Sequence, residues 1–175
     1  LVLAALAPGR QVLVSRGESV EIGGGFRVPD VMEQSGAVLV DVGTTNRTRR
    51  ADYAKALARK NADVALILKV HPSNYRIEGF VEDTPVDQLA TLGVPVVADI
   101  GSGLIDAQCP WLGGPPPGWL AGEPAARQSL AAGGAYQLLV IPLLAEGGRR
   151  DHVNRVLLVD APESGQLERL MRRDG

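Results

Sequence analysis

Short, nearly continuous apolar runs recur along the chain and are separated by more polar segments. Six of these runs predict β-strands, at residues 11–14, 37–42, 64–70, 94–100, 137–141 and 156–159. Because they are apolar at consecutive positions and do not alternate, they are typical of strands covered on both faces, as in a parallel sheet. We therefore expect an α/β fold in three layers, with a mostly parallel sheet between helices.

The segments between these runs carry signals of helix starts and ends. Thr84 followed by Pro85 predicts a helix start, with Thr84 as N-cap and Pro85 in the first turn. Pro29 and Asp30 open another helix, which Gly36 is expected to close. Helix-forming composition or spacing also covers residues 51–60, 123–132 and 162–173. The apolar start of the chain, residues 1–7, is interpreted as part of a helix.

Composition and charge are those of an ordinary globular protein. The chain has 175 residues, of which 45% are hydrophobic and 22% charged, enough for a sizeable core. Its net charge of −2 shows no general basic excess, although a local basic patch stays open. No apolar run approaches the roughly 20 residues of a membrane helix. The single cysteine, Cys109, excludes an internal disulfide and predicts a reducing compartment such as the cytoplasm.

Two loops, at residues 14–30 and 42–48, combine glycines, small hydroxyl side chains and arginines. Glycine allows the main chain to approach a ligand, and N–H groups and guanidinium groups bind phosphate or carboxylate. Arg16, Arg27 and Arg47 therefore predict an anion-binding pocket. A solvated loop surface explains the same spacing, and both interpretations stay open.

Asp99 and His71 each end an apolar run, where ligands gather in parallel α/β folds. The alternatives are a carboxylate that caps a turn and a structural histidine. Lys69, two residues before His71, should point to the same side and is a candidate nucleophile. Lys55 and Lys60 are expected on a solvent-facing helix surface.

Other features of the sequence point to no chemistry. His152, in a charged stretch, is expected to be solvated, and Cys109 to be an inert thiol. The Pro- and Gly-rich residues 109–119 predict a surface connection. No HExxH motif, CxxC pair or carboxylate cluster indicates a metal, and neither GxSxG nor GxxxxGK[ST] occurs.

Five segments in a fixed order carry a family resemblance over residues 1 to about 135. They read VSRGESVEIGGGFRVPD, VGTTNRT, KVHPSNYRIEGF, VPVVADIGSG and GEPAARQSLAAGG. This part resembles bacterial L-seryl-tRNA(Sec) selenium transferase, or selenocysteine synthase. The resemblance implies part of a fold-type-I large domain that uses pyridoxal 5'-phosphate. It also implies conversion of seryl-tRNA(Sec) with selenophosphate into selenocysteyl-tRNA(Sec), and a homo-oligomer in the intact family.

The resemblance also implies roles for single residues. Asp99 resembles the carboxylate that pairs with the pyridine nitrogen of the cofactor, and His71 would lie near its ring. The further cofactor-binding candidate is Ser102. The candidates for binding substrate or anions are Arg16, Arg47, Thr45, Asn46, Ser73 and Asn74.

The sequence departs from the family after Ala135. There the family continues to a segment like SGDKLLGG, whose lysine holds the cofactor, whereas this chain reads YQLLVIPLL. Lys69 is no substitute, because it belongs to the KVHxSNY motif and is distinct from the Schiff-base lysine of the family. By this resemblance, we expect the 175 residues to contain neither the family's upstream portion nor its carboxyl-terminal domain. We therefore expect no catalysis by this chain alone.

Residues 136–175 resemble a different family, dephospho-CoA kinase, which uses ATP. Glu146 falls in its PLLxE segment, and Arg173 in its VDxPExxQLxRLMxRDG segment, where a solvated basic helix end is the alternative. The phosphate-cradling GxxxxGK[ST] loop of that family is missing. Three interpretations follow: part of a selenium transferase, which we favour for the main body; a kinase fragment; or a non-catalytic hybrid joined near Ala135.

Overall fold

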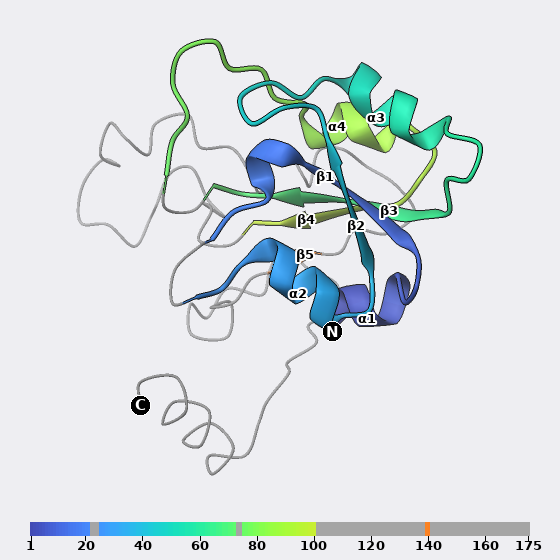
Figure 1. Cartoon of the computed structure of the whole chain (residues 1–175). Helices are drawn as coiled ribbons and strands as arrows, with labels where there is room; N and C mark the ends of the chain where they lie inside the picture. Colours follow the sequence, from blue (N-terminus) through green and yellow to red (C-terminus); the bar gives the residue numbers. More distant parts are fainter. Residues whose placement is uncertain (22–24, 73–74, 101–138, 141–175) are drawn as a thin grey trace, which may run out of the picture. The chain divides into compact units, whose positions relative to one another are not determined.

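Five parallel strands form one sheet in this computed structural model, which describes residues 1–21, 25–72, 75–100 and 139–140 (Figure 1). All of them belong to one unit, Leu1–Pro142. The strand order is β2-β1-β3-β4-β5, and every pairing is parallel. The strands are β1 (Gln11–Ser15), β2 (Val38–Val42), β3 (Val64–Val70), β4 (Val96–Asp99) and β5 (Leu139–Val140). The predicted α/β class with a mostly parallel sheet is confirmed.

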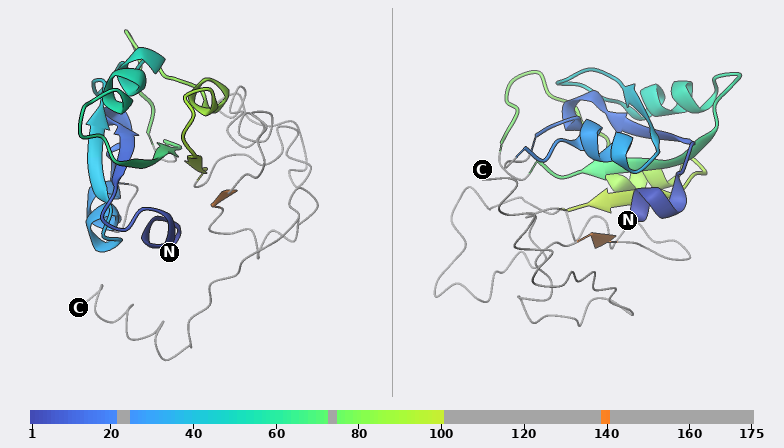
Figure 2. Two further views of the ribbon diagram at one scale, coloured as in Figure 1. Left: turned by 90° about the vertical axis from the view of Figure 1, so that its right-hand side faces the viewer. Right: turned by 60° about the horizontal axis from the view of Figure 1, so that its bottom comes forward.

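Helices cover both faces of this sheet, as the views in Figures 1 and 2 show. One face carries α1 (Val2–Leu6) and α2 (Val28–Gln34), and the other carries α3 (Arg50–Leu57) and α4 (Val86–Ala90). A short 3-10 turn, η1 (Arg16–Glu18), follows β1 directly.

The core is divided between the two faces because successive strand residues point in opposite directions. On the α2 side, Met32 packs with Val12 and other buried strand residues. On the α3 and α4 side, Tyr53 and Leu89 pack with Leu13 and Ile67. All six of these side chains are completely buried. This two-sided burial explains why the strands are apolar at consecutive positions.

The connections give the sheet a switch point between β1 and β3. The chain leaves β1, passes through α2 on one face and enters β2 beside β1. It then passes through α3 on the opposite face and enters β3 on the other side of β1. In open parallel sheets, ligands bind outside the carboxyl ends of the strands at such a point. The fold therefore makes the loops that follow β1 and β3 the candidate location of a binding site.

Two predicted helix starts differ in detail from the structure. The N-cap of α4 is Pro85, not Thr84, because the Thr84 hydroxyl is buried and donates to the Thr48 carbonyl at 2.8 Å. Helix α2 begins one residue before Pro29, with Arg27 as its N-cap. Gly36 follows α2 at φ +76°, as predicted for a residue that closes a helix.

Several predicted features lie outside the described residues. They are the helices at 123–132 and 162–173, the strand at 156–159 and the connection at 109–119. Of the predicted strand at 137–141, only Leu139 and Val140 are described, as β5. Within the described part of the chain, no helix is long and apolar enough to cross a membrane.

Candidate binding site at the carboxyl edge of the sheet

The carboxyl ends of the strands bring several predicted residues to one edge of the sheet. Arg16 follows β1, the loop with Arg47 follows β2, His71 follows β3, and Asp99 ends β4. Val70 pairs with Asp99 in register, and the His71 N–H donates to the Asp99 carbonyl at 2.8 Å. His71 and Asp99 are both half-buried. The sequence thus located a shared edge, while the chemical roles of these residues remain predictions.

The two glycine-rich loops are in direct contact at this edge. A side chain at Gly17 would collide with the carbonyl oxygen of Thr45, so this approach requires glycine. The hydroxyls of Ser15 and Thr48 share a buried hydrogen bond of 2.7 Å. Gly43 has φ +68° and packs against Thr48 closely enough to exclude a Cβ. The loops after β1 and β2 therefore form one packed unit.

Arg47 and Arg49 share one carboxylate. Arg47 Nη2 lies 2.7 Å from Glu82 Oε2, and Arg49 Nε lies 2.8 Å from the same oxygen. Hydrogen bonds from Arg47 and Arg49 lower the pKa of the Glu82 carboxyl below its usual value. All three side chains are exposed enough for solvent to screen these pairs. An anion that binds Arg47 would have to compete with Glu82.

The other two predicted arginines differ in how they are engaged. Arg27 Nε donates to Glu21 Oε2 at 2.7 Å in an exposed pair ahead of α2. Arg16 Nε is 3.9 Å from Asp41 Oδ2, too far for a hydrogen bond, and its side chain is 60% exposed. Among the described residues, the Arg16 guanidinium therefore forms this long ion pair and no hydrogen bond.

Lys69 lies in a cluster of charges at the switch point. Its Nζ donates to Glu18 Oε1 at 2.7 Å and to Asp83 Oδ1 at 2.5 Å, and its side chain is only 15% exposed. Burial lowers the pKa of Lys69, but the Glu18 and Asp83 carboxylates raise it, and the net direction is upward. A protonated amine held by two carboxylates is not a nucleophile. The interpretation of Lys69 as a candidate nucleophile is therefore wrong.

Glu18 is the residue at this edge that sequence reasoning missed. It is 7% exposed, and its second oxygen accepts the Val70 N–H at 2.8 Å. Burial raises the pKa of the Glu18 carboxyl against the opposing effects of Lys69 and that N–H group. Lys69 inside an apolar strand was a usable signal, since a buried cation needs a paired carboxylate. The position of Lys69 alone could not identify which acidic residue supplies that carboxylate.

Of the remaining candidates, two lie in the loop after β2 and the others lie outside the described residues. Asn46 Nδ2 donates to the Phe80 carbonyl at 2.7 Å, and the neighbouring Thr45 is exposed. Both belong to the loop after β2. The candidates that lie outside the described residues are Ser73, Asn74, Ser102, Glu146 and Arg173. In the described part of the chain, no group of three His, Cys, Asp or Glu residues could hold a metal ion.

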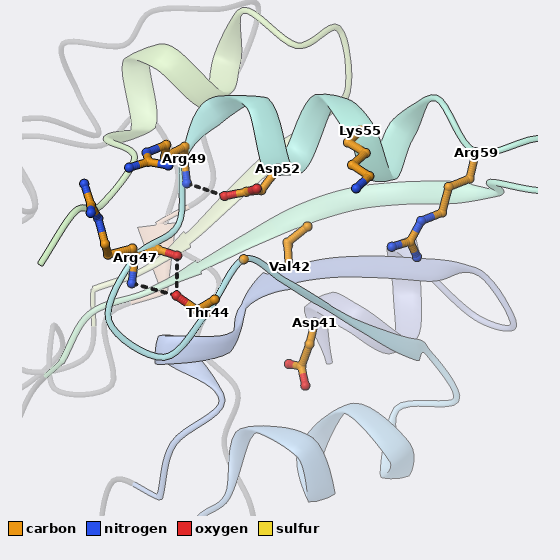
Figure 3. Close-up of a pocket in the computed structure, with 9 residues that line it drawn as sticks. Asp41, Val42, Thr44, Arg47, Arg49, Asp52, Lys55 and Arg59 are labelled. Atoms are coloured by element: carbon orange, nitrogen blue, oxygen red, sulfur yellow. Dashed lines mark hydrogen bonds between the residues drawn. The ribbon is translucent and has the colours of Figure 1, made fainter.

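An open cavity of about 440 Å³ lies between the end of β2 and helix α3 (Figure 3). We call it the β2–α3 groove. Its lining residues are Asp41, Val42, Gly43, Thr44, Arg47, Arg49, Asp52, Lys55 and Arg59. Asp52 caps α3 by accepting the Arg49 N–H at 2.8 Å. Lys55 and Lys60 are both exposed, as predicted, but Lys60 lies in the turn after α3 and not on the helix.

The fold and this edge define an α/β protein whose candidate site lies at the carboxyl ends of parallel strands. The chain belongs to the L-seryl-tRNA selenium transferase family, whose sequence model matches residues 1–135. A dephospho-CoA kinase model matches residues 123–175, so the two matches share residues 123–135. Both resemblances predicted from the sequence are confirmed.

Individual relatives agree with this assignment. The L-seryl-tRNA(Sec) selenium transferase of Haemophilus ducreyi is 42% identical over 180 residues, covering 99% of this chain and 37% of the relative. That of Alkaliphilus metalliredigens is 50% identical over 138 residues, covering 76% of this chain and 27% of the relative. The chain thus spans about a third of the length of these proteins. Among solved structures, D-glucosaminate-6-phosphate ammonia-lyase matches with a TM-score of 0.44 and 22% identity, over 53% of this chain and 24% of that one.

Proposed function

We propose that this chain carries part of the cofactor- and substrate-binding surface of a selenium transferase. The reaction converts seryl-tRNA(Sec) and selenophosphate into selenocysteyl-tRNA(Sec). The observation that carries the proposal is the placement of His71 and Asp99 side by side at the ends of β3 and β4. They stand within the residues that match the family, 1–135.

The residues at this edge fit the non-covalent parts of pyridoxal 5'-phosphate. Asp99 supplies a half-buried carboxylate that would hold the protonated pyridine nitrogen, and His71 would lie beside the ring. Arg16 supplies an exposed guanidinium for the phosphate or for a substrate anion. When bound, the cofactor supplies an electron sink for loss of the serine hydroxyl. The protein residues position the reacting groups and balance their charge.

The chain does not supply the amine that captures the cofactor aldehyde. Its sequence contains three lysines, Lys55, Lys60 and Lys69, and the structure describes all of them. Lys69 is held protonated between Glu18 and Asp83. Lys55 and Lys60 are exposed residues of α3 and of the turn after it. We therefore propose that this chain alone binds the cofactor reversibly and does not complete the reaction.

Titration with pyridoxal 5'-phosphate, followed by borohydride reduction and peptide mapping, tests this proposal. We expect an absorbance change that dialysis reverses, and no reduced adduct on a single lysine. Asp99→Asn should weaken binding roughly tenfold, since it removes a charge-assisted hydrogen bond. Asp87→Asn, an exposed change in α4, is the matched control. A stable adduct on one lysine, or equal losses in both variants, would contradict the proposal.

The match of residues 123–175 to dephospho-CoA kinase supports a second proposal. Under this alternative, Glu146 and Arg173 belong to a partial ATP-dependent kinase segment fused to the selenium-transferase part near Ala135. Because the sequence has no GxxxxGK[ST] loop to hold the phosphates, the hybrid would be non-catalytic. A thermal shift with ATP or dephospho-CoA, and none with pyridoxal 5'-phosphate, would favour this alternative. The opposite result favours the first proposal.

A further inference from the structure

The β2–α3 groove is basic, although the whole chain carries a net charge of −2. Four of its nine lining residues are cations: Arg47, Arg49, Lys55 and Arg59. Its two lining carboxylates are Asp41 and Asp52. Figure 3 shows the Asp41 side chain on the opposite side of β2 from α3, where its carboxylate accepts the Ser19 hydroxyl at 2.6 Å. Asp41 therefore offsets little of the positive charge on the α3 side of β2.

Two of the cations are uncompensated. The Lys55 and Arg59 side chains form no hydrogen bond or ion pair with any residue that the structure describes. Lys55 lies in α3 and Arg59 in the bend that follows it, and Figure 3 shows both side chains pointing towards β2. Among the described residues, the Arg47 and Arg49 side chains share a single ion-pair partner, Glu82. This excess of positive charge attracts an anion to the groove.

The form of the groove indicates which kind of anion it takes. A pocket for a small phosphate compound encloses its ligand with a few convergent polar groups. Here the cations are exposed and are distributed along the groove from the loop after β2 to the end of α3. An extended row of exposed cations matches a polyanion whose phosphates follow one another, as in a nucleic-acid backbone.

We propose that the β2–α3 groove binds the phosphate backbone of an RNA, through Lys55 and Arg59 and with Arg47 and Arg49 at its other end. This inference rests on the proposed function, whose substrate is an RNA, and it assigns to that RNA a surface whose lining includes neither His71 nor Asp99. Contacts of this kind position an RNA without reading its bases. Binding should therefore be insensitive to sequence and strongly dependent on salt.

Fluorescence anisotropy with a labelled RNA hairpin of arbitrary sequence, titrated at several salt concentrations, tests the groove. Arg59→Gln and Lys60→Gln form a matched pair, because they remove one charge each from adjacent exposed residues and only Arg59 lines the groove. We expect Arg59→Gln to reduce the slope of log K against log salt by about 1. Combining Lys55→Gln with Arg59→Gln should reduce it by about 2. Lys60→Gln should leave the slope unchanged.

Three results would overturn the proposal. The first is equal effects of Arg59→Gln and Lys60→Gln, which would mean that only net charge matters. The second is no hairpin binding by the unaltered chain at low salt. The third is displacement of the hairpin by micromolar inorganic phosphate at constant ionic strength, which would identify a site for a small ligand. The cofactor titration contains no RNA, so failure of this proposal and failure of the proposed function give separate results.

Discussion

Replacing Lys69 by methionine tests the charge cluster at the switch point most directly. Methionine preserves the length of the apolar stem and removes the ammonium group. The change would leave Glu18, which is 7% exposed, as a buried carboxylate whose remaining hydrogen-bond donor among the described residues is the Val70 N–H. Removing one partner of a buried ion pair costs about 3–5 kcal/mol, because the other charge remains buried without compensation.

The expected loss comes mainly from Glu18 and little from Asp83. The Asp83 side chain is 59% exposed, so water screens its bond to Lys69 and its share is about 0–1 kcal/mol. The Glu18 side chain is 9% exposed and has no such access to solvent. Glu18 can also relieve part of the penalty by taking up a proton, which burial already favours. We therefore expect a loss near the lower limit, about 3 kcal/mol in the free energy of unfolding.

Urea unfolding followed by circular dichroism measures this loss. The double variant Lys69→Met with Glu18→Gln should recover at least half of it, since the neutral amide removes the uncompensated charge and its oxygen can still accept the Val70 N–H. Lys60→Met, at an exposed position, should stay within about 0.5 kcal/mol of the unaltered chain. The reasoning is refuted if Lys69→Met costs less than about 1 kcal/mol or if the double variant is no more stable than the single one.

Three further predictions concern the same region. Because the folded pKa of Lys69 is raised above its ordinary value of 10.5, its contribution is complete below that pH and is lost as pH rises through the higher folded value. Melting temperature should therefore fall above about pH 10.5, and should fall less in Lys69→Met. The Tyr53 hydroxyl is buried without a hydrogen-bond partner in the described part of the chain, so Tyr53→Phe should be neutral or stabilising by up to about 1 kcal/mol in thermal unfolding. A loss of more than about 1 kcal/mol would show that this hydroxyl is bonded. Gly17→Ala should cost about 1–3 kcal/mol in urea unfolding because its methyl group would overlap the Thr45 carbonyl, and an unchanged stability would contradict the close packing of the two loops.

The strands could be predicted from the sequence because burial on both faces makes them apolar at consecutive positions. Residues 64–70 were predicted as a strand, and β3 has these bounds. The placement of His71 and Asp99 at one edge followed from the rule that the carboxyl ends of parallel strands lie together. The order of the strands could not be predicted, since each apolar run fits any place in a sheet that is covered on both sides.

The polar contacts at the carboxyl edge of the sheet could not be predicted from the sequence for a different reason. Lys69 and Glu18 are 51 residues apart, and no local pattern marks one as the partner of the other. Thr84 has the residue type and position typical of an N-cap. Its hydroxyl instead donates to the carbonyl of Thr48, 36 residues away, and Pro85 is the N-cap of α4. In both cases a distant partner decides what the side chain does, so tertiary contacts override the local preference.

The all-parallel order of the strands has a consequence for how the chain assembles during synthesis. No two neighbouring strands are joined by a tight turn. Strand β1 can form its first strand pair only after residues 38–42 have been synthesised. The opposite flank of β1 is completed only when residues 64–70 have emerged, and β4 then adds to β3. Because closing such long connections costs entropy before any contact offsets it, we expect folding to be slow and to leave apolar strands exposed meanwhile. We therefore expect the sheet to start from the β1–β2 pair and to extend through β3 to β4 as the ribosome delivers these strands, so binding by a chaperone would matter most before β3 is complete.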